Sequence, residues 1–346
     1  MEQLGTAVVG VGTLGKRHAE NLRRKIPEAR LIAVADADGR RAAQVAAELE
    51  IPQYYDKLEG ILEHKEIRAV VIAAPSKFHG KAIEEAAVHG KHIFCEKPLA
   101  LSKEDADKTL AVVTKAGVQL QIGFMRRYDP AYAAAQQQIE AGEIGDPVIF
   151  KSVARDQQPP PPAFFQGGVN GTIFSDVAIH DFDLARWMMK DEVAGIHSYA
   201  GLLACPELAR FGDVDATLVN LRFSRGGIGN IEAFRKATYG YDIRTEVLGT
   251  KGAVHVGYLR QTAFHVLTRD GIRQDIVNHW LVRFADAYLE EMRDFVRNVI
   301  AGKPVRVTGQ DGRQALIAAL AAEQSFRESR PVEVSTEAGP ASVAGM

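Results

Sequence analysis

The sequence is poor in cysteine: Cys95 and Cys205 are the only two in 346 residues. Two isolated thiols provide neither a disulfide framework nor the clustered ligands of a structural zinc site. We therefore predict no metal centre. Any chemistry must come from other side chains or from an organic cofactor.

The chain also lacks a dominant charge and a long apolar run. Lys plus Arg number 42 and Asp plus Glu number 44, a net charge of −2, with no basic stripe of the kind that binds nucleic acid. No run of about 18 apolar residues is present, so no transmembrane helix is expected. The start, MEQLG, lacks the basic-then-apolar form of a signal peptide. We expect a soluble, cytoplasmic protein that binds neither nucleic acid nor membrane.

Apolar residues, in contrast, make up 46% of the sequence, which is enough for a large core. A length of 346 residues suggests two domains.

A glycine-rich loop near the beginning carries the most specific pattern. A short apolar run, residues 7–9, leads into GxGxxG, and a helical pattern follows over residues 16–25. The first glycine permits a tight turn, the second lets the backbone approach a pyrophosphate, and the third lets helix and strand pack closely. The helix N-terminus then presents unpaired N–H groups to the phosphates. The dinucleotide-binding residues predicted here are Gly10, Gly12, Thr13, Leu14 and Gly15.

A carboxylate follows at the spacing that this fingerprint requires. A second apolar run ends on Asp36, about 20 residues past the glycines, where an acidic side chain can accept hydrogen bonds from an adenosine ribose. The carboxylate repels a 2′-phosphate, so NAD is predicted over NADP. Arg40 and Arg41 lie nearby and could soften that preference, although a solvated helix start is the simpler explanation for them.

Apolar runs and helical patterns alternate as far as Gly123. Residues 69–74 form a continuous apolar run typical of a buried parallel strand, and residues 92–95 form the next strand. The alternation predicts an α/β Rossmann domain, a doubly wound parallel sheet, over residues 1–123. Ligands bind at the carboxyl ends of such strands. Further cofactor-binding residues predicted at that edge are Ala74, Pro75, His79, Glu96 and Lys97.

The pattern changes after residue 123. Strand-like segments separated by hairpin turns predict an α+β domain over residues 124–334, built on a large, open, mostly antiparallel sheet. One face of that sheet must be covered by helices or by a second subunit. Residues 335–346 are small and polar and are predicted to be disordered. The predicted strands are 148–153, 196–199, 216–223, 228–234, 245–248, 253–256 and 263–268, and the predicted helices are 132–141, 175–189, 280–300 and 309–327.

A proline-rich run interrupts this second domain. Residues 157–162, QQPPPP, can form neither a helix nor a central strand. The run is either a lid beside the active site or a stiff surface connector, and the sequence favours neither.

Three residues outside the glycine loop have the chemistry that alcohol oxidation needs. Lys97 leaves the sheet on the ligand side, although most lysines are solvated surface residues. Asp176 and His180 are four residues apart on one face of a predicted helix, where acids near the N-terminus and a half-buried histidine are also ordinary. A histidine can take the hydroxyl proton and a lysine can stabilise the alkoxide. Asp176 would orient substrate hydroxyls or tune His180, and NAD would accept the hydride.

Several motifs together resemble the Gfo/Idh/MocA oxidoreductase family. The motifs are GVGTLGKRHAENL, AAPSKFH, CEKPL, GFMRRYDPAY and SDVAIHDFDLARW, and the resemblance covers about residues 5–334. It implies that Lys97, Asp176 and His180 form a catalytic triad in which His180 is the base. It also implies that Glu96 and Pro98 shape the nicotinamide pocket, with an unusual peptide geometry at Pro98. The residues implied to bind substrate are Lys97, Arg127, Asp156, Asp176, His180 and, more weakly, Tyr239 and Tyr241.

Two segments, GFMRRYDP and YGYDIRTEVLGTKG, are most similar to the members of that family that oxidise inositol. The resemblance implies oxidation of the axial hydroxyl of myo-inositol to its 2-keto product in inositol catabolism. It also implies a homo-oligomer, a tetramer or a dimer, paired through the C-terminal sheet. The alternatives are another cyclic polyol, sugar or glycoside, such as scyllo-inositol or glucose, and a non-catalytic sensor of NAD and sugar. A sensor has no need of the lysine, aspartate and histidine together.

Overall fold

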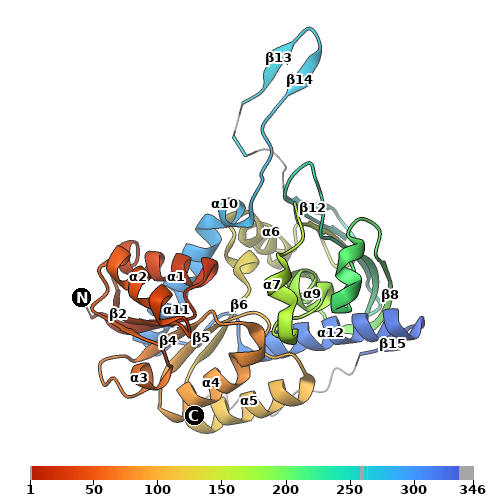
Figure 1. The fold of residues 1–346 in the computed structure, drawn as a ribbon. Helices are drawn as coiled ribbons and strands as arrows, with labels where there is room; N and C mark the ends of the chain where they lie inside the picture. The colour runs from red at the N-terminus through yellow and green to blue at the C-terminus, as the bar shows by residue number, and fades with distance from the viewer. Residues whose placement is uncertain (1, 258–260, 263, 335–346) are drawn as a thin grey trace. The chain divides into compact units, whose positions relative to one another are not determined.

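The computed structural model describes residues 2–257, 261, 262 and 264–334 (Figure 1). The chain divides into two compact units. Among the described residues, the first contains residues 2–125 and 288–316, and the second contains residues 126–257, 261, 262, 264–287 and 317–334. Each unit is therefore assembled from two separate stretches of the chain. The predicted disordered tail, residues 335–346, lies outside the described residues.

The first unit is built on a six-stranded sheet in which every pair of neighbours is parallel. The strand order β3-β2-β1-β4-β5-β6 reverses between β1 and β4, which is the switch point where a doubly wound sheet binds its ligand. The predicted fold class of this half of the chain is confirmed. The strands are β1 Leu4–Val9, β2 Ala29–Ala35, β3 Gln53–Tyr55, β4 Ala69–Ile72, β5 His92–Glu96 and β6 Leu120–Gly123.

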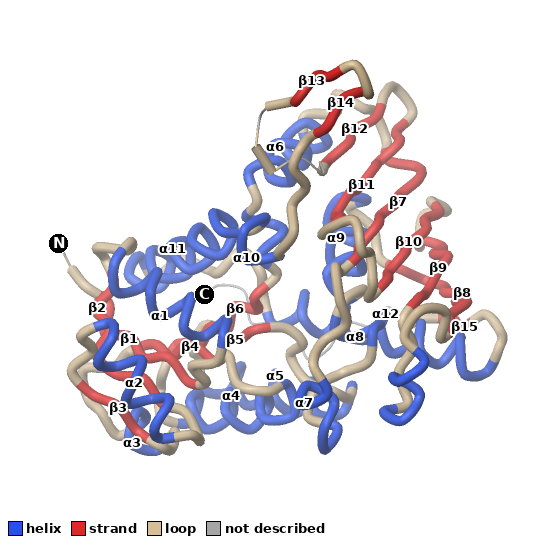
Figure 2. Tube along the Cα trace, turned by 45° about the horizontal axis from the view of Figure 1, so that its top comes forward, coloured by secondary structure: helices blue, strands red, loops and turns tan. Residues whose placement is uncertain are grey.

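Side-chain caps mark where two helices of this unit begin. The Asp38 side chain accepts hydrogen bonds from the backbone N–H groups of Arg40 and Arg41, and Ser102 accepts one from the N–H of Asp105. Helices α4 and α5 lie side by side on one face of the sheet (Figure 2). The helices are α1 Thr13–Arg24, α2 Gly39–Leu49, α3 Glu59–Leu62, α4 His79–Val88 and α5 Lys103–Ala116.

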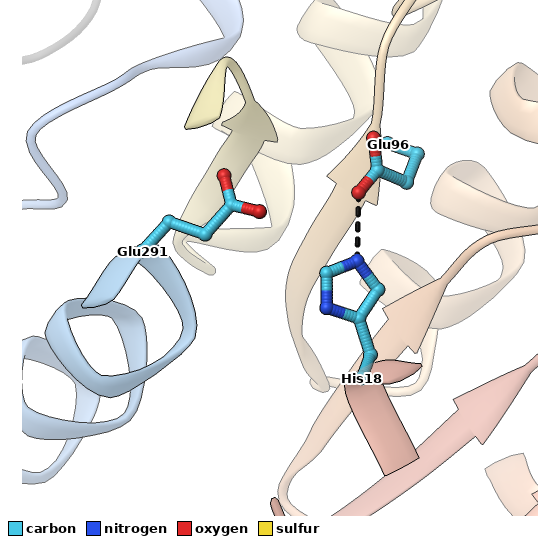
Figure 3. Close-up of side chains that lie close together, drawn as sticks. All are labelled: His18, Glu96 and Glu291. Carbon is cyan, nitrogen blue, oxygen red and sulfur yellow. Dashed lines mark hydrogen bonds and ion pairs between the residues drawn. The ribbon is translucent and has the colours of Figure 1, made fainter. Parts of the chain in front are cut away.

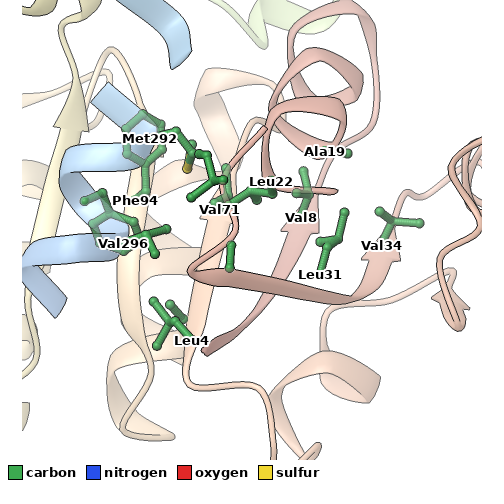
Figure 4. Close-up of a cluster of buried hydrophobic side chains, with 14 of the residues drawn as sticks. Leu4, Val8, Ala19, Leu22, Leu31, Val34, Val71, Phe94, Met292 and Val296 are labelled. Carbon is green, nitrogen blue, oxygen red and sulfur yellow. The ribbon is translucent and has the colours of Figure 1, made fainter. Parts of the chain in front are cut away.

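Helix α11, Ala285–Ala301, supplies part of the core of this first unit (Figure 4). Its residues Met292 and Phe295 are fully buried in the same apolar cluster as Leu4 and Phe94. The rings of Phe94 and Phe295 meet edge to face, with centroids 5.9 Å apart. From its sequence alone, this stretch is predicted to belong to the second domain. Periodicity predicts a helix with one apolar face, but it does not tell which sheet that face covers.

The second unit is built on a seven-stranded sheet of order β12-β11-β7-β10-β9-β8-β15. Only β7 and β10 pair in parallel; every other neighbouring pair is antiparallel. The predicted, mostly antiparallel sheet is therefore confirmed. The strands are β7 Pro147–Arg155, β8 Val193–Gly201, β9 Ala216–Phe223, β10 Ile228–Phe234, β11 Asp242–Gly249, β12 Ala253–Val256 and β15 Val332–Glu333.

One face of this sheet packs on helix α9, Ile179–Met189, which contacts β7 and β10. The other face carries exposed apolar side chains. Residues of β9 alternate between buried and exposed, as a half-covered strand requires. The exposed apolar residues of this open face are Tyr199, Leu218, Ile228 and Leu248.

The remaining described elements include a two-stranded hairpin, β13 Val266–Thr268 and β14 Gly271–Arg273. The predicted strand 263–268 began at residue 263, which lies outside the described residues. None of the described helices combines the length and the apolar character needed to cross a membrane. The other helices are α6 Pro130–Glu140, α7 Pro162–Phe165, α8 Ile173–Asp176, α9 Ile179–Met189, α10 Trp280–Arg283 and α12 Gly309–Glu328.

Candidate active site

The loop between β1 and α1 has the backbone that the glycine pattern predicts. Gly10 has φ +82°, a left-handed conformation that favours glycine, and its N–H donates to the carbonyl oxygen of Ala35 at 2.8 Å. A Cβ on Gly15 would lie 1.8 Å from the carbonyl oxygen of Gly10. Strand and helix therefore approach so closely here that no larger residue fits.

Gly12 faces open space instead. A Cβ added there would meet no atom within 4 Å. Gly12 is also the N-cap of α1 and, as a glycine, has no side chain that could cap this end of the helix, where Thr13 and Leu14 form the first turn. An open glycine beside an uncapped helix N-terminus fits the pyrophosphate of a dinucleotide.

Asp36 lies against this loop, directly after β2. Its Oδ2 accepts a hydrogen bond from the N–H of Val11 at 2.9 Å, and its Oδ1 accepts one from the N–H of Asp38 at 2.9 Å. The two backbone bonds fix the orientation of a carboxylate that is only 9% exposed. This placement suits hydrogen bonds to a ribose.

Arg41 adds a positive charge beside Asp36. Its Nη1 lies 3.3 Å from both carboxylate oxygens, and its side chain is 49% exposed. The guanidinium is therefore paired with Asp36, whereas the sequence analysis treated it as part of a solvated helix start.

His79 connects the loops that follow β4 and β5. Its Nε2 lies 2.7 Å from the carbonyl oxygen of Ala74, and its Nδ1 lies 2.7 Å from that of Pro98. Burial lowers the pKa of His79. Because both ring nitrogens face backbone carbonyls, this side chain contacts both the loop of Ala74 and Pro75 and the loop of Pro98.

Glu96 belongs to a buried acid–base cluster with His18 and Glu291 (Figure 3). Its Oε1 lies 2.7 Å from Nε2 of His18, and one ligand atom of each residue lies within 4.8 Å of the other two. Neither carboxylate oxygen of Glu291 has a hydrogen-bond partner among the described residues. Burial and the neighbouring Glu96 raise the pKa of Glu291 well above its usual range. Nε2 of His18 is engaged with Glu96, whereas its Nδ1 has no hydrogen-bond partner among the described residues.

Lys97 follows at the carboxyl end of β5, in the first unit. The side chain is half-buried, and the peptide bond from Lys97 to Pro98 is cis. The unusual peptide geometry expected at Pro98 is therefore confirmed.

Asp176 and His180 lie on consecutive helical segments of the second unit. Asp176 ends α8, and His180 is the second residue of α9. The single helix predicted over residues 175–189 is interrupted because the N–H groups of Val177 and Ala178 both bond to the carbonyl oxygen of Ile173. His180 is 8% exposed and the Asp176 side chain 20% exposed. Both are accessible in part, as residues that touch a substrate must be.

The carboxylate of Asp176 is bound by a buried arginine that the sequence analysis did not single out. Arg235 is 0% exposed, and its Nη1 donates to Oδ2 of Asp176 at 3.0 Å. Its Nη2 lies 3.1 Å from Oδ2 of Asp213. Asp156 also stabilises the Arg235 charge electrostatically. The structure thus brings Asp156 and Asp176, two predicted site residues, together around one guanidinium.

Two predicted substrate contacts are engaged in other interactions. Arg127 donates from Nε and Nη2 to the two oxygens of Asp183 at 2.8 and 2.5 Å, and its guanidinium lies 5.6 Å from the Trp187 ring centroid. The hydroxyl of Tyr239 accepts a hydrogen bond from Arg155 and donates one to Asp242, both at 2.7 Å. Tyr241, the weaker candidate, is buried. These contacts suit roles in holding the second unit together.

Comparison with known families supplies the context for this geometry. A family model described as an oxidoreductase family with an NAD-binding Rossmann fold matches residues 4–124. A second model, the GFO/IDH/MocA C-terminal domain, matches residues 132–255. The chain belongs to the Gfo/Idh/MocA oxidoreductase family. Its first unit contains the NAD-binding Rossmann domain of that family, and NAD is its cofactor.

Several members of the Gfo/Idh/MocA family are similar to this chain over nearly its full length. The scyllo-inositol 2-dehydrogenase (NAD(+)) of Bacillus subtilis is 41% identical over 96% of both chains. The myo-inositol 2-dehydrogenase of Thermotoga maritima is 37% identical over 94% of this chain and 97% of its own. The structure of Lactobacillus casei scyllo-inositol dehydrogenase with NAD(H) and scyllo-inositol matches with a TM-score of 0.90 at 31% identity, over 96% and 99% of the two chains.

The sequence alone does not predict that Arg235 and Asp213 lie beside Asp176. Arg235 and Asp213 lie 59 and 37 positions from Asp176 along the chain, so no local spacing connects them. A signal was present in the sequence nevertheless. Arg235 precedes the YGYD motif, and Asp213 begins a DVD motif directly before β9. A charged residue that becomes buried beside such a sheet is expected to form an ion pair with a residue of opposite charge.

Proposed function

We propose that this oxidoreductase is an NAD-dependent inositol 2-dehydrogenase. It would oxidise the axial secondary hydroxyl of myo-inositol to 2-keto-myo-inositol (scyllo-inosose). The observation that carries the proposal is its likeness, over at least 94% of each chain, to relatives named for this chemistry. The presence of Lys97, Asp176 and His180 in the same chain supports it.

The first unit would hold the dinucleotide through its backbone and a few side chains. Gly12 and the first turn of α1 would bind the pyrophosphate, and Asp36 would bind the adenosine ribose. Ala74, Pro75, Glu96 and Lys97 would border the nicotinamide, with His79 holding their loops in place. When bound, NAD supplies the hydride acceptor.

The second unit would supply the acid–base chemistry. His180 would take the proton of the substrate hydroxyl, a role that a neutral imidazole can fill near neutral pH. Asp176, oriented by Arg235, would bind substrate hydroxyls beside it. Lys97 is assigned through the family resemblance, and its ammonium would stabilise the oxygen from which the proton leaves. Asp156 is retained as a substrate contact, whereas the engaged polar groups of Arg127 and Tyr239 favour a supporting role.

A second candidate substrate is scyllo-inositol, whose ring hydroxyls are all equatorial. The observation that favours it is the 41% identity to the Bacillus subtilis enzyme named for that substrate. The two candidates differ in the orientation of one hydroxyl, so a few hydrogen bonds in the second unit would decide between them.

The test is a panel of initial rates of NADH formation. It would compare myo-inositol, scyllo-inositol, D-chiro-inositol, glucose and xylose, each with NAD and with NADP. We expect the highest kcat/KM for myo-inositol with NAD. A preference for scyllo-inositol would select the second candidate, and a preference for glucose or xylose would contradict both. Tight NADH binding without any turnover would favour a sensor.

The turnover of a His180 variant tests whether oxidation of the substrate depends on this residue. Replacing this residue, His180→Ala, should lower kcat by about 10²–10⁴-fold because the general base is removed. NADH binding, followed by fluorescence, should be unchanged because the dinucleotide residues lie in the first unit. Near-normal turnover would remove His180 from the mechanism.

We also propose that the open face of the seven-stranded sheet pairs with a second copy of the chain. Its exposed apolar residues, Tyr199, Leu218, Ile228 and Leu248, are the kind of surface that association buries. Leu218→Lys should shift the mass measured by light scattering toward the monomer, with Val88→Lys as the control because Val88 is an exposed apolar residue of the first unit. A wild-type monomer would contradict the proposal.

A further inference from the structure

Arg235 is a fully buried charge of the second unit that contacts a proposed catalytic residue. It follows β10 directly and is 0% exposed. Its backbone N–H donates to the carbonyl oxygen of Asp215 at 2.9 Å, which anchors the residue to the neighbouring chain segment. A charge so far from water must be compensated by fixed partners.

Those partners are carboxylates on two sides of the guanidinium. On one side Nη1 donates to Oδ2 of Asp176 at 3.0 Å. On the other, Nη2 lies 3.1 Å from Oδ2 of Asp213, a charge contact without hydrogen-bond geometry. Asp213 is itself fixed, because its Oδ1 accepts a hydrogen bond from the N–H of Ile173 at 2.9 Å, at the first residue of the helix that ends with Asp176. The same four residues therefore tie both ends of α8 to Arg235.

Charge balance makes the guanidinium indispensable to this arrangement. Asp156, Asp176 and Asp213 all stabilise the Arg235 charge. Burial raises the pKa of Asp213, and the nearby Asp176 adds to the effect while Arg235 opposes it. Without the guanidinium the acids would face one another in a poorly solvated site, where repulsion drives carboxylates apart or into their protonated form.

The short helix α7, which begins at the end of the proline-rich run, contacts the guanidinium of this ion pair. Phe165, the last residue of α7, lies with its ring centroid 5.6 Å from the guanidinium carbon of Arg235. Its ring stacks on that of Phe211, with centroids 4.9 Å apart and an angle of 19° between the planes. An aromatic face over a guanidinium attracts the cation and keeps water away from it.

We propose that Arg235 is the positioning residue of the active site: it holds the Asp176 carboxylate in one orientation, and Phe165 covers the guanidinium. The inference rests on the proposed function, since it requires that Asp176 acts in catalysis. Asp176 ends a helix of only four residues, so its own element provides little to fix its side chain. The helix α7, which begins at the last proline of the proline-rich run, then borders the site through Phe165.

A double-mutant cycle tests this inference. Arg235→Gln, Asp176→Asn and the double variant are compared for kcat and KM with myo-inositol, or with whichever panel substrate turns over best. Each single change should lower kcat by about 10²-fold, because misplacing a catalytic group by a small distance has an effect of that size. If Arg235 acts through Asp176, the double variant should be no slower than Asp176→Asn alone. NADH binding should be unchanged in all three.

The controls separate positioning from structural damage. Arg222→Gln removes an exposed arginine that pairs with Glu333 on the same sheet, and its kcat should equal that of the wild type. Phe165→Leu leaves the ion pair in place and provides the test if Arg235→Gln does not fold; its smaller loss of kcat should also vanish in the Asp176→Asn background. If the loss of kcat in a double variant equals the product of the losses in its two single variants, the inference about Arg235 is wrong, whereas the proposed function still stands. Normal turnover of Asp176→Asn would overturn both the inference and the catalytic role of Asp176.

Discussion

Asp36 is held beside the glycine loop by two backbone N–H groups and is paired with Arg41. Asp36→Ala should lower kcat/KM with NAD by about 10–100-fold, because hydrogen bonds to a charged group contribute about 1.5–3 kcal/mol. The loss with NADP should be much smaller, since the change removes repulsion of the 2′-phosphate and leaves the Arg41 cation in place. Equal losses with the two cofactors, measured by initial rates, would refute the ribose assignment.

Glu291 makes the stability of the first unit depend on pH. Its pKa in the folded state is raised by burial and by Glu96 above the ordinary value of 4.5. A raised folded-state pKa contributes stability that is present below 4.5 and is lost as the pH rises. Glu291→Gln removes this dependence, so the variant should melt at a higher temperature than the wild type above that pH, by a margin that grows with pH.

A matched control for that effect is the neighbouring residue. Glu290 has a side chain that is 45% exposed and pairs with Arg293, so Glu290→Gln should leave the pH dependence of the melting temperature unchanged. The melting temperatures of Glu291→Gln and of the wild type are compared across pH 5–9. A difference between them that does not change with pH would show that Glu291 does not titrate in this way.

At the scale of the element, the turn between β1 and α1 separates two kinds of glycine. Gly12→Ala adds a methyl group to open space and should change the free energy of unfolding by only about 0.5 kcal/mol. It should nevertheless weaken NADH binding about tenfold or more, because the methyl group would fill space needed by the pyrophosphate. Gly15→Ala places a Cβ 1.8 Å from the Gly10 oxygen and should destabilise the fold by about 1–3 kcal/mol.

Thermal unfolding and NADH fluorescence titration, applied to both glycine variants, distinguish these outcomes. A Gly12→Ala protein that binds NADH normally would show that the dinucleotide does not approach this residue. A Gly15→Ala protein as stable as the wild type would show that the turn adapts to a side chain.

Elements whose pattern is local were predicted well from the sequence. Strands β9, β10 and β12 begin and end where alternation predicted. The break between α8 and α9 was missed because Val177 and Ala178 keep near-helical backbone angles and no proline or glycine marks the site. The candidate site divides in the same way: the glycine loop and Asp36 follow from spacing, whereas the contact of Arg235 with Asp176 joins residues 59 positions apart. Only the folded sheet brings such residues together.

At the scale of the whole molecule, neither unit is a continuous stretch of chain. Four side chains of α11, those of Met292, Phe295, Val296 and Val299, are buried in the core of the first unit. At about 1.5–3 kcal/mol each, their burial contributes about 6–12 kcal/mol, which is comparable to the entire stability of a typical domain. A fragment of residues 1–125 should therefore not fold.

Circular dichroism and NADH titration test this expectation. The fragment of residues 1–125 should show no cooperative melting and no NADH binding. The same fragment joined by a flexible linker to residues 288–316 should recover both. A cooperative transition in the short fragment would show that the sheet and its first helices suffice on their own.

Because each unit is formed from two separate stretches of the chain, the arrangement also determines when folding can be completed during synthesis. The ribosome adds residues 288–316 and 317–334, the segments that complete the two units, only after it has made residue 287. The core of the N-terminal sheet therefore stays incomplete, with apolar surface exposed, until residues 288–316 have been made. We expect nascent chains to depend on chaperones for most of their synthesis, and products of premature termination to be degraded without ever holding NAD.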